Sequence, residues 1–253
     1  MRNWIVLFIG TMLVVNLTAC NKADGDGLAK DADGLPVIEE LMQKSREAFE
    51  MRDSYSIEKH ETIKKFDEYD GKKEQDSIRN VDYKYEYSKD PQIFYIERPD
   101  EFMVSKEYYS EHGFALFSVN EWSSSHKWPY TEAQLKEQFD PYQFMATYNL
   151  SMHALKVKEE GGKYVVSTAA TFNDNEDPSK TMKKDIKNKL TLTYFIDKKT
   201  YLPTKVTTVL NREIKENSEM TRHVERSAEY IYHSLSSAKK KKLINMDKEI
   251  MKE

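Results

Sequence analysis

Cysteine and glycine are both scarce in this sequence. It has one cysteine, Cys20, and eight glycines in 253 residues. A single cysteine excludes an intramolecular disulfide, so burial of apolar side chains has to stabilise the fold. An excess of one charge is also missing, because 39 basic and 43 acidic residues leave a formal net charge of −4. This balance argues against nucleic acid as a partner and against strong attraction to anionic lipid.

Motifs for catalysis, metal binding and cofactor binding are absent as well. None of the six histidines stands in a His-Glu-x-x-His frame. The sequence contains no Gly-x-Ser-x-Gly elbow, no phosphate-binding glycine loop and no dinucleotide fingerprint. The acidic run from Asp174 to Asp177 is more typical of a solvated loop than of a cation site. We therefore expect a non-enzymatic protein with no catalytic residues, no cofactor and no metal.

The N-terminus has the layout of a secretory signal. Arg2 precedes an uncharged apolar run from Trp4 to Val15, which is too short for a stable membrane span. The run ends in Leu17-Thr18-Ala19-Cys20, which resembles the lipobox of bacterial lipoproteins. The resemblance implies that residues 1–19 are a signal peptide and that Cys20 is acylated, as by palmitate. The alternative is an ordinary signal followed by a cysteine that stays buried or free.

Residues 20–35 are small, polar and acidic, and we interpret them as a flexible tether. Two Asp-x-Asp-Gly units begin at Asp24 and Asp31 and are similar to calcium loops. However, the twelve-residue calcium pattern ends in Glu, and counting from Asp24 that position is Leu35. Residues 36–253 are then expected to form one domain with a charged C-terminal tail, in which residues 239–253 are a solvated terminus.

Two stretches show helical periodicity. Apolar residues between Ile38 and Phe49 recur every three or four positions, which predicts an amphipathic helix that follows Pro36. A second helix, capped by Thr131, is expected to contain Leu135 and Phe139. A short helix should restart with Asp140 as its cap and Pro141 at its first position. Phe144, Met145 and Tyr148 would then face the sheet.

The rest of the chain alternates with a period of two, which predicts antiparallel strands. The clearest alternation places Val81, Tyr83, Tyr85 and Tyr87 on one face. Turn signals stand at Asp70-Gly71 and Gly161-Gly162. Residues 173–189 are interpreted as a long loop or a short surface helix, and residues 220–235 as a strand whose front half could be helical. We expect strands at about residues 55–66, 81–87, 93–96, 102–109, 114–119, 155–157, 164–172, 190–196 and 206–210.

Aromatic side chains give the one positive indication of a binding site. Seven of them are candidates for the lining of an apolar cavity on the concave side of a curved sheet. The other interpretation is that they pack as core residues under a helix, and the sequence leaves both open. The candidates are Tyr83, Tyr85, Tyr87, Phe114, Phe117, Trp122 and Trp128.

The order of these features resembles a group of Gram-positive lipoproteins that are similar to the LolA, LppX and RseB superfamily. The resemblance rests on the lipobox, the tyrosine strand, the tryptophan before the middle helix and the segment Tyr194 to Lys205. It implies an α+β fold, in which a curved antiparallel sheet, an incomplete barrel, packs over an N-terminal helix and a middle helix.

The same resemblance implies a function. We expect a lipoprotein on the extracytoplasmic face of the cytoplasmic membrane that binds a lipid or an acyl chain in the half-barrel. The alternative is an envelope module that binds, senses or inhibits another protein, as RseB-like domains do.

Overall fold

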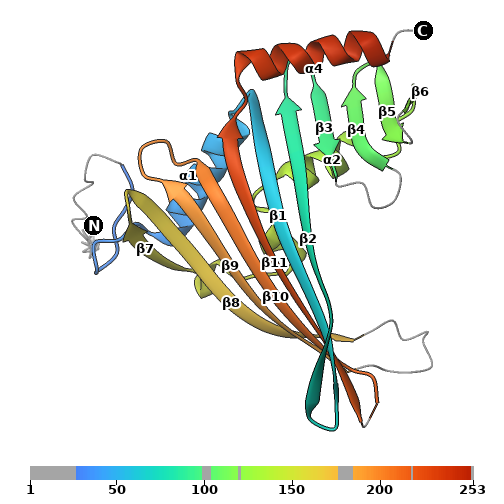
Figure 1. The fold of residues 1–253 in the computed structure, drawn as a ribbon. Coiled ribbons are helices and arrows are strands. Elements are labelled where there is room, and N and C mark those ends of the chain that lie inside the picture. Colours follow the sequence, from blue (N-terminus) through green and yellow to red (C-terminus); the bar gives the residue numbers. More distant parts are fainter. Residues whose placement is uncertain (1–26, 99–103, 119–120, 176–184, 218, 252–253) are drawn as a thin grey trace, which may run out of the picture.

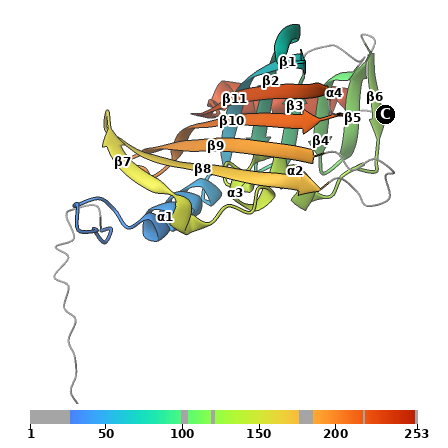
Figure 2. The same ribbon diagram turned by 90° about the horizontal axis from the view of Figure 1, so that it is seen from below.

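The computed structural model describes residues 27–98, 104–118, 121–175, 185–217 and 219–251. The predicted signal peptide and Cys20 lie outside these residues. The described elements form an open, curved antiparallel sheet with helices on both faces (Figures 1 and 2). The helices are α1 (Ile38–Glu50), α2 (Glu132–Phe139), α3 (Gln143–Thr147), the 3-10 turn η1 (Met152–Ala154) and α4 (Ser237–Ile250).

Eleven strands make up the sheet in the described part of the chain. Each neighbouring pair is antiparallel, and β6 and β7 lie at opposite edges, so the sheet stays open. This confirms the predicted α+β fold with an incomplete barrel. In spatial order the strands are β6 (Glu121–Ser125), β5 (Gly113–Ser118), β4 (Val104–Ser110), β3 (Ile93–Glu97), β2 (Lys72–Ser88), β1 (Ser54–Tyr69), β11 (Met220–Ser234), β10 (Pro203–Lys215), β9 (Asp185–Asp197), β8 (Lys163–Asn175) and β7 (Lys156–Glu160).

The turn between β1 and β2 has the backbone that the sequence predicts. Asp70 and Gly71 have φ angles of 47° and 76°, so both central residues are in the left-handed region that a type I′ hairpin needs. The hairpin registers Ser54 with Ser88, which brings the start of β1 beside the end of β2. That end of the hairpin forms part of the cavity described below.

The central strands are longer than predicted. The expectation of a loop or helix over residues 173–189 is wrong for its described parts, because β8 extends to Asn175 and β9 begins at Asp185. β11 is a strand from Met220 onward, with no helical front half. In this extension β9 still alternates, with Ile186 and Leu190 buried between exposed polar or charged residues. Ion pairs between strands add to the backbone pairing, such as Arg222 Nε to Asp67 Oδ1 at 3.0 Å.

Helices α1, α2 and α3 cover the concave face of the sheet (Figure 2). The predicted α1 is confirmed, and it buries Leu41 and Phe49. α2 is confirmed with its cap, since Thr131 and Gln134 exchange the hydrogen bonds of a capping box. The third helix starts later than predicted, at Gln143. Asp140 accepts a hydrogen bond from the Tyr142 N–H and stabilises a turn before α3 rather than its first helical position.

The predicted solvated C-terminus is wrong, because residues 237–250 form α4 on the convex face of the sheet. Leu243 is buried against a second core that includes Ile93, Tyr95 and Tyr108. The Tyr108 hydroxyl donates a hydrogen bond to the Leu243 carbonyl at 3.0 Å. α4 therefore shields the apolar residues on the convex side of β3, β4 and β5 from solvent.

Part of the predicted tether contacts the domain, whereas residues 31–34 form an exposed turn. Leu28 is buried in the concave core, and the Val37 N–H donates to the Ala29 carbonyl at 2.9 Å. Asp31 Oδ1 accepts a hydrogen bond from the Leu35 N–H at 2.9 Å, so this carboxylate holds a turn. The part of the tether that precedes Gly27 lies outside the described residues.

Candidate functional site

The seven aromatic candidates are divided between the two faces of the sheet. Five of them lie on the concave side or pack against its core, namely Tyr83, Tyr85, Tyr87, Phe114 and Trp128. Phe117 and Trp122 form a pair on the convex side, with ring centroids 5.3 Å apart, and Trp122 packs against the core under α4. The structure therefore does not bring the seven together around one space.

Side chains fill the concave face where α2 crosses it. The ring of Phe139 is fully buried, and its centroid lies 5.4 Å from the rings of Tyr85 and Phe94. It also lies 6.5 Å from the ring of Tyr87. Beneath α2, the half-barrel is thus a packed aromatic core rather than an empty cup.

Tyr83 lies beside a cluster of charges in which Glu61 is buried, Lys59 is mostly buried and Arg226 is exposed. Lys59 Nζ lies 4.4 Å above the centre of the Tyr83 ring. The same ammonium is 3.2 Å from Glu61 Oε2, and Arg226 Nε is 2.9 Å from Glu61 Oε1. Burial lowers the pKa of Lys59, while the attraction of Glu61 opposes that change. These contacts pair the charges with one another beside the Tyr83 ring.

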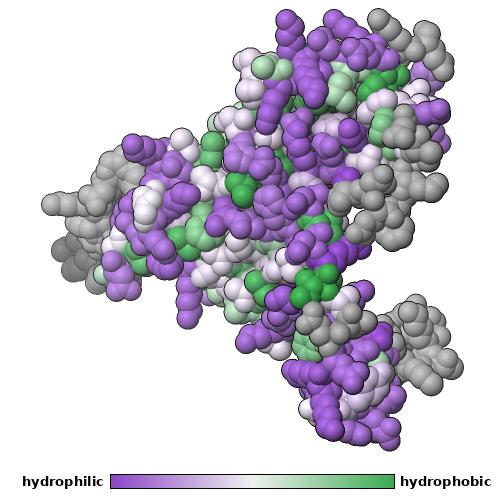
Figure 3. Space-filling view, viewed as in Figure 1, coloured by the Kyte–Doolittle hydropathy of each residue, from purple (hydrophilic) through white to green (hydrophobic). Residues whose placement is uncertain are grey.

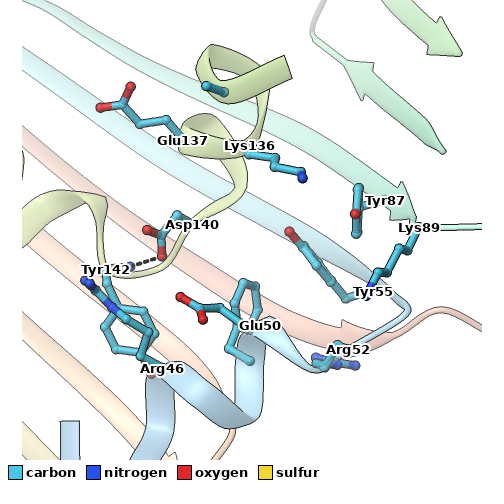
Figure 4. A pocket seen from close by; sticks show the side chains of 12 residues that line it. Arg46, Glu50, Arg52, Tyr55, Tyr87, Lys89, Lys136, Glu137, Asp140 and Tyr142 are labelled. Carbon is cyan, nitrogen blue, oxygen red and sulfur yellow. Dashed lines mark hydrogen bonds between the residues drawn. The ribbon is translucent and has the colours of Figure 1, made fainter. Parts of the chain in front are cut away.

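A cavity of about 560 Å³ lies between α1, α2 and the adjoining ends of β1 and β2 (Figure 4). It is open to solvent. Of the seven predicted residues, only Tyr87 lines it. The lining side chains are Arg46, Phe49, Glu50, Arg52, Tyr55, Tyr87, Lys89, Ala133, Lys136, Glu137, Asp140 and Tyr142.

Three aromatic rings make the apolar floor of this cavity, which we call the aromatic floor: Phe49, Tyr55 and Tyr87. The ring centroids of Phe49 and Tyr55 are 4.7 Å apart, and those of Tyr55 and Tyr87 are 5.1 Å apart. Each side chain is mostly buried. Burial raises the pKa of both tyrosines, so their phenols stay neutral and can act as hydrogen-bond donors.

Cationic groups surround the side of the cavity next to Tyr55 and Tyr87. We call Arg52, Lys89 and Lys136 the cationic wall (Figure 4). The Arg52 guanidinium donates to the His233 carbonyl at 3.1 Å, and burial lowers its pKa. Lys136 pairs with Glu132 one helical turn earlier, and that hydrogen bond raises the pKa of the lysine.

Carboxylates surround the opposite side, and we call Glu50, Glu137 and Asp140 the anionic wall (Figure 4). Burial raises the pKa of Asp140, and the hydrogen bond that it accepts from the Tyr142 N–H at 2.8 Å opposes this shift. Arg46 lies on the same side, with its guanidinium 5.2 Å from the centre of the Tyr142 ring. Tyr142 in turn forms a buried hydrogen bond with Ser45 of α1, which fixes the helix against this turn.

A second cavity, of about 590 Å³, opens where η1 and the end of α3 meet β8 and β10. Tyr148, Leu150, Phe172 and Leu210 give it apolar walls, and Ala154 lies on its border. Its lining includes one charged side chain, Arg212, which donates a hydrogen bond to Asn188 at 2.9 Å. This cavity is similar in size to the first but lacks its two charged walls.

Sequence reasoning missed most of the first cavity because its residues are distant in the sequence. Phe49 lies in the last turn of α1, Tyr55 is the second residue of β1, and Lys89 follows β2, so the site depends on how these ends meet. The one available signal was the aromatic pair on either side of the α1–β1 junction.

The surface seen in Figure 3 is mostly hydrophilic, with hydrophobic residues in small separate areas.

Within the described ranges, no three His, Cys, Asp or Glu side chains gather as a metal site. None of the helices in the same ranges is both long and apolar enough to cross a bilayer.

Comparison with known proteins adds little. No family model and no curated protein matches the sequence. One solved structure with some similarity is the YwiB protein from Bacillus subtilis, at 12% sequence identity and a TM-score of 0.21. The match covers 75% of this chain and 99% of YwiB. A TM-score this low establishes no common fold.

Proposed function

We propose that the protein is a non-enzymatic lipoprotein that binds an amphiphile in the cavity between α1 and α2. The aromatic floor takes the apolar part of the ligand, and the charged rim faces its polar part. The observation that carries the proposal is the cavity itself. Its volume of about 560 Å³ lies within the range of roughly 300–1,000 Å³ that small-ligand sites occupy. Four aromatic residues line it together with seven charged ones.

This site differs from the cup that the resemblance to LolA, LppX and RseB proteins implies. Phe139 and its neighbours fill the half-barrel beneath α2. The ligand is therefore placed at the rim of that core, where Tyr55 and Tyr87 still border an open space. A lipid or an acyl chain remains the proposed class of ligand. Its apolar part would contact the aromatic floor of the cavity instead of the interior of the half-barrel.

The proposed anchor at Cys20 would hold this cavity close to the bilayer. Leu28 is buried, so the packed part of the chain begins within a few residues of the lipobox. An extended chain spans at most about 3.6 Å per residue, so the path from Cys20 to Gly27 is at most about 25 Å. The ligand would then be drawn from the outer leaflet of the cytoplasmic membrane.

Two exposed alanines give a matched test, because each borders one of the two large cavities. Ala133 lies on α2 and Ala154 on η1. Ala133→Trp should fill the first cavity and weaken binding of a fluorescent fatty acid by about tenfold or more, equivalent to at least about 1.4 kcal/mol. Ala154→Trp should leave binding unchanged.

The measurement is a fluorescence titration of residues 20–253 carrying Cys20→Ser, supported by native mass spectrometry of the same protein. Absence of both probe uptake and co-purified lipid would refute the proposal. Equal binding by the two variants would place the site elsewhere. In cells, Cys20→Ser should release folded protein from the membrane, and a misfolded product would contradict the role given to this cysteine.

A second candidate function is an envelope module that binds or senses another protein. The packed concave face favours it, because an RseB-like interaction domain does not need an empty half-barrel. Crosslinking in intact cells distinguishes the two functions. One dominant protein partner together with no lipid uptake would support the interaction module, whereas lipid uptake blocked by Ala133→Trp would support the carrier.

A further inference from the structure

Apart from Arg46, which lies beside the anionic wall, the charges around the α1–α2 cavity are separated by sign across its mouth. Figure 4 shows the cationic wall beside Tyr55 and Tyr87, and the anionic wall on the side of Tyr142. With Arg46 included, four cationic and three anionic side chains line the cavity. The lining is therefore nearly neutral as a whole but strongly dipolar. A ligand with a single charge would be attracted by one wall and repelled by the other.

The two walls do not neutralise each other. Among the described residues, no salt bridge joins a lining cation to a lining carboxylate, and none involves Lys89, Glu50 or Glu137. The ion pair that Lys136 makes is with Glu132, which lies outside the lining. Arg52 is held by the His233 carbonyl and the Ser234 hydroxyl, neither of which is charged. Each wall thus keeps charge that a ligand of opposite sign can meet.

The aromatic floor lies between the walls and fixes where the apolar part of a ligand can go. Tyr55 and Tyr87 carry their rings on the floor, and burial keeps their phenols protonated as neutral donors. An anion beside the hydroxyl ends of these rings would meet the phenolic donors together with Arg52 and Lys89. A cation on the other side would meet carboxylate oxygens, which only accept hydrogen bonds.

We infer that the cavity recognises a zwitterionic amphiphile. Its anionic group would lie at the cationic wall, its ammonium group at the anionic wall, and its apolar part on the aromatic floor. This inference rests on the proposed function and narrows it from amphiphiles in general to those with a phosphate and an amine on one head group. Hydrogen bonds to charged groups are stronger than those between neutral groups, which makes such selection physically reasonable.

The test compares four dodecyl probes that share one chain and differ in head group, each used below its micelle concentration. The probes are dodecylphosphoethanolamine, dodecyl sulfate, dodecylammonium and dodecyl maltoside. Isothermal titration of the full mature chain carrying Cys20→Ser should show the zwitterionic probe binding about tenfold tighter than each of the others. Equal affinity for all four would overturn the inference and leave the proposed function standing. No binding of any probe would overturn both.

Charge reversal on each wall sharpens the test, because Lys89 and Glu137 are both exposed at the mouth. Lys89→Glu should weaken the zwitterionic probe and strengthen the cationic one, whereas Glu137→Lys should weaken the zwitterionic probe and strengthen the anionic one. Lys127→Glu and Glu121→Lys reverse exposed charges outside the lining and serve as controls. If the wall variants change affinity no more than these controls, the walls do not select the ligand.

Discussion

The concave and convex cores of this protein both bury one face of the sheet, but they differ in how many helices cover that face. On the concave face, three helices cover aromatic residues from strands across the sheet. On the convex face, α4 alone covers a smaller group from β3, β4 and β5, with Leu243 as its one buried side chain. A helix rich in lysine can thus be a structural cover when the sheet beneath it is apolar on both faces.

The difference between the two cores predicts a difference in stability, with the largest effect on the concave side. Phe139 is fully buried among Tyr55, Tyr85, Tyr87 and Phe94. Phe139→Ala should lower the free energy of unfolding by about 3–5 kcal/mol, because it removes apolar contact and leaves a cavity. Urea denaturation measures this loss. A change below about 1 kcal/mol, the typical effect of a point mutation, would show that the concave core is not tightly packed.

On the convex side, Leu243→Ala should cost about 2–3 kcal/mol, near the lower end for a buried leucine, because partly exposed neighbours can close over the space. This variant should also bind a hydrophobic dye more strongly, since α4 is the cover of Ile93, Tyr95 and Tyr108. Equilibrium unfolding and dye fluorescence test both effects. A loss as large as that of Phe139→Ala, without added dye binding, would remove the distinction between the cores.

The smallest effect concerns Asp140, at the border between the concave core and the cavity. Burial raises its pKa, so ionisation of this carboxyl costs stability as the pH rises above the usual pKa of an aspartate. Asp140→Asn keeps an oxygen that can accept the Tyr142 N–H but carries no charge. The variant should be more stable than the wild type at neutral pH, and the difference should disappear as the pH falls through the raised pKa.

Thermal unfolding of the wild type and of Asp140→Asn at several pH values checks whether the variant is the more stable protein at neutral pH. A variant that is less stable than the wild type at neutral pH would mean that attraction to Arg46 outweighs desolvation of Asp140.

Local signals predicted the concave half of the fold well. The apolar spacing from Ile38 to Phe49 and the cap at Thr131 act over a few residues, so α1 and α2 follow from the sequence directly. The alternation ending at Tyr87 and the turn at Asp70-Gly71 likewise predicted the first hairpin. Each of these elements has one buried face and one solvent-exposed face, so its apolar residues recur with the period of a helix or a strand.

The convex core was missed because its signal lies in two distant segments. The run Ile93-Phe94-Tyr95-Ile96 is apolar on both faces, which is typical of a strand covered on both sides. Its cover comes from the far end of the chain, where consecutive lysines from Lys239 to Lys242 conceal the apolar spacing of Leu243, Met246 and Ile250. Pairing the two segments needs the topology of the whole sheet.

The candidate site was largely unpredictable for a related reason. Its floor combines the end of α1, the start of β1 and the end of β2, and the register of Ser54 with Ser88 brings the two strand ends together. Of the predicted aromatic residues, Tyr85 and Phe114 became core and Tyr87 reached the cavity. Residue type alone does not distinguish these outcomes, because helix placement decides which rings stay accessible.

The most direct test of the proposed binding site is an NMR titration of the mature Cys20→Ser protein with dodecylphosphoethanolamine, followed by amide chemical shifts. We expect the largest changes at Arg52, Tyr87, Lys89 and Lys136, around the cavity between α1 and α2. Changes confined to the second cavity, at Tyr148 and Phe172, or to α4 would contradict it. So would the absence of any change at saturating probe.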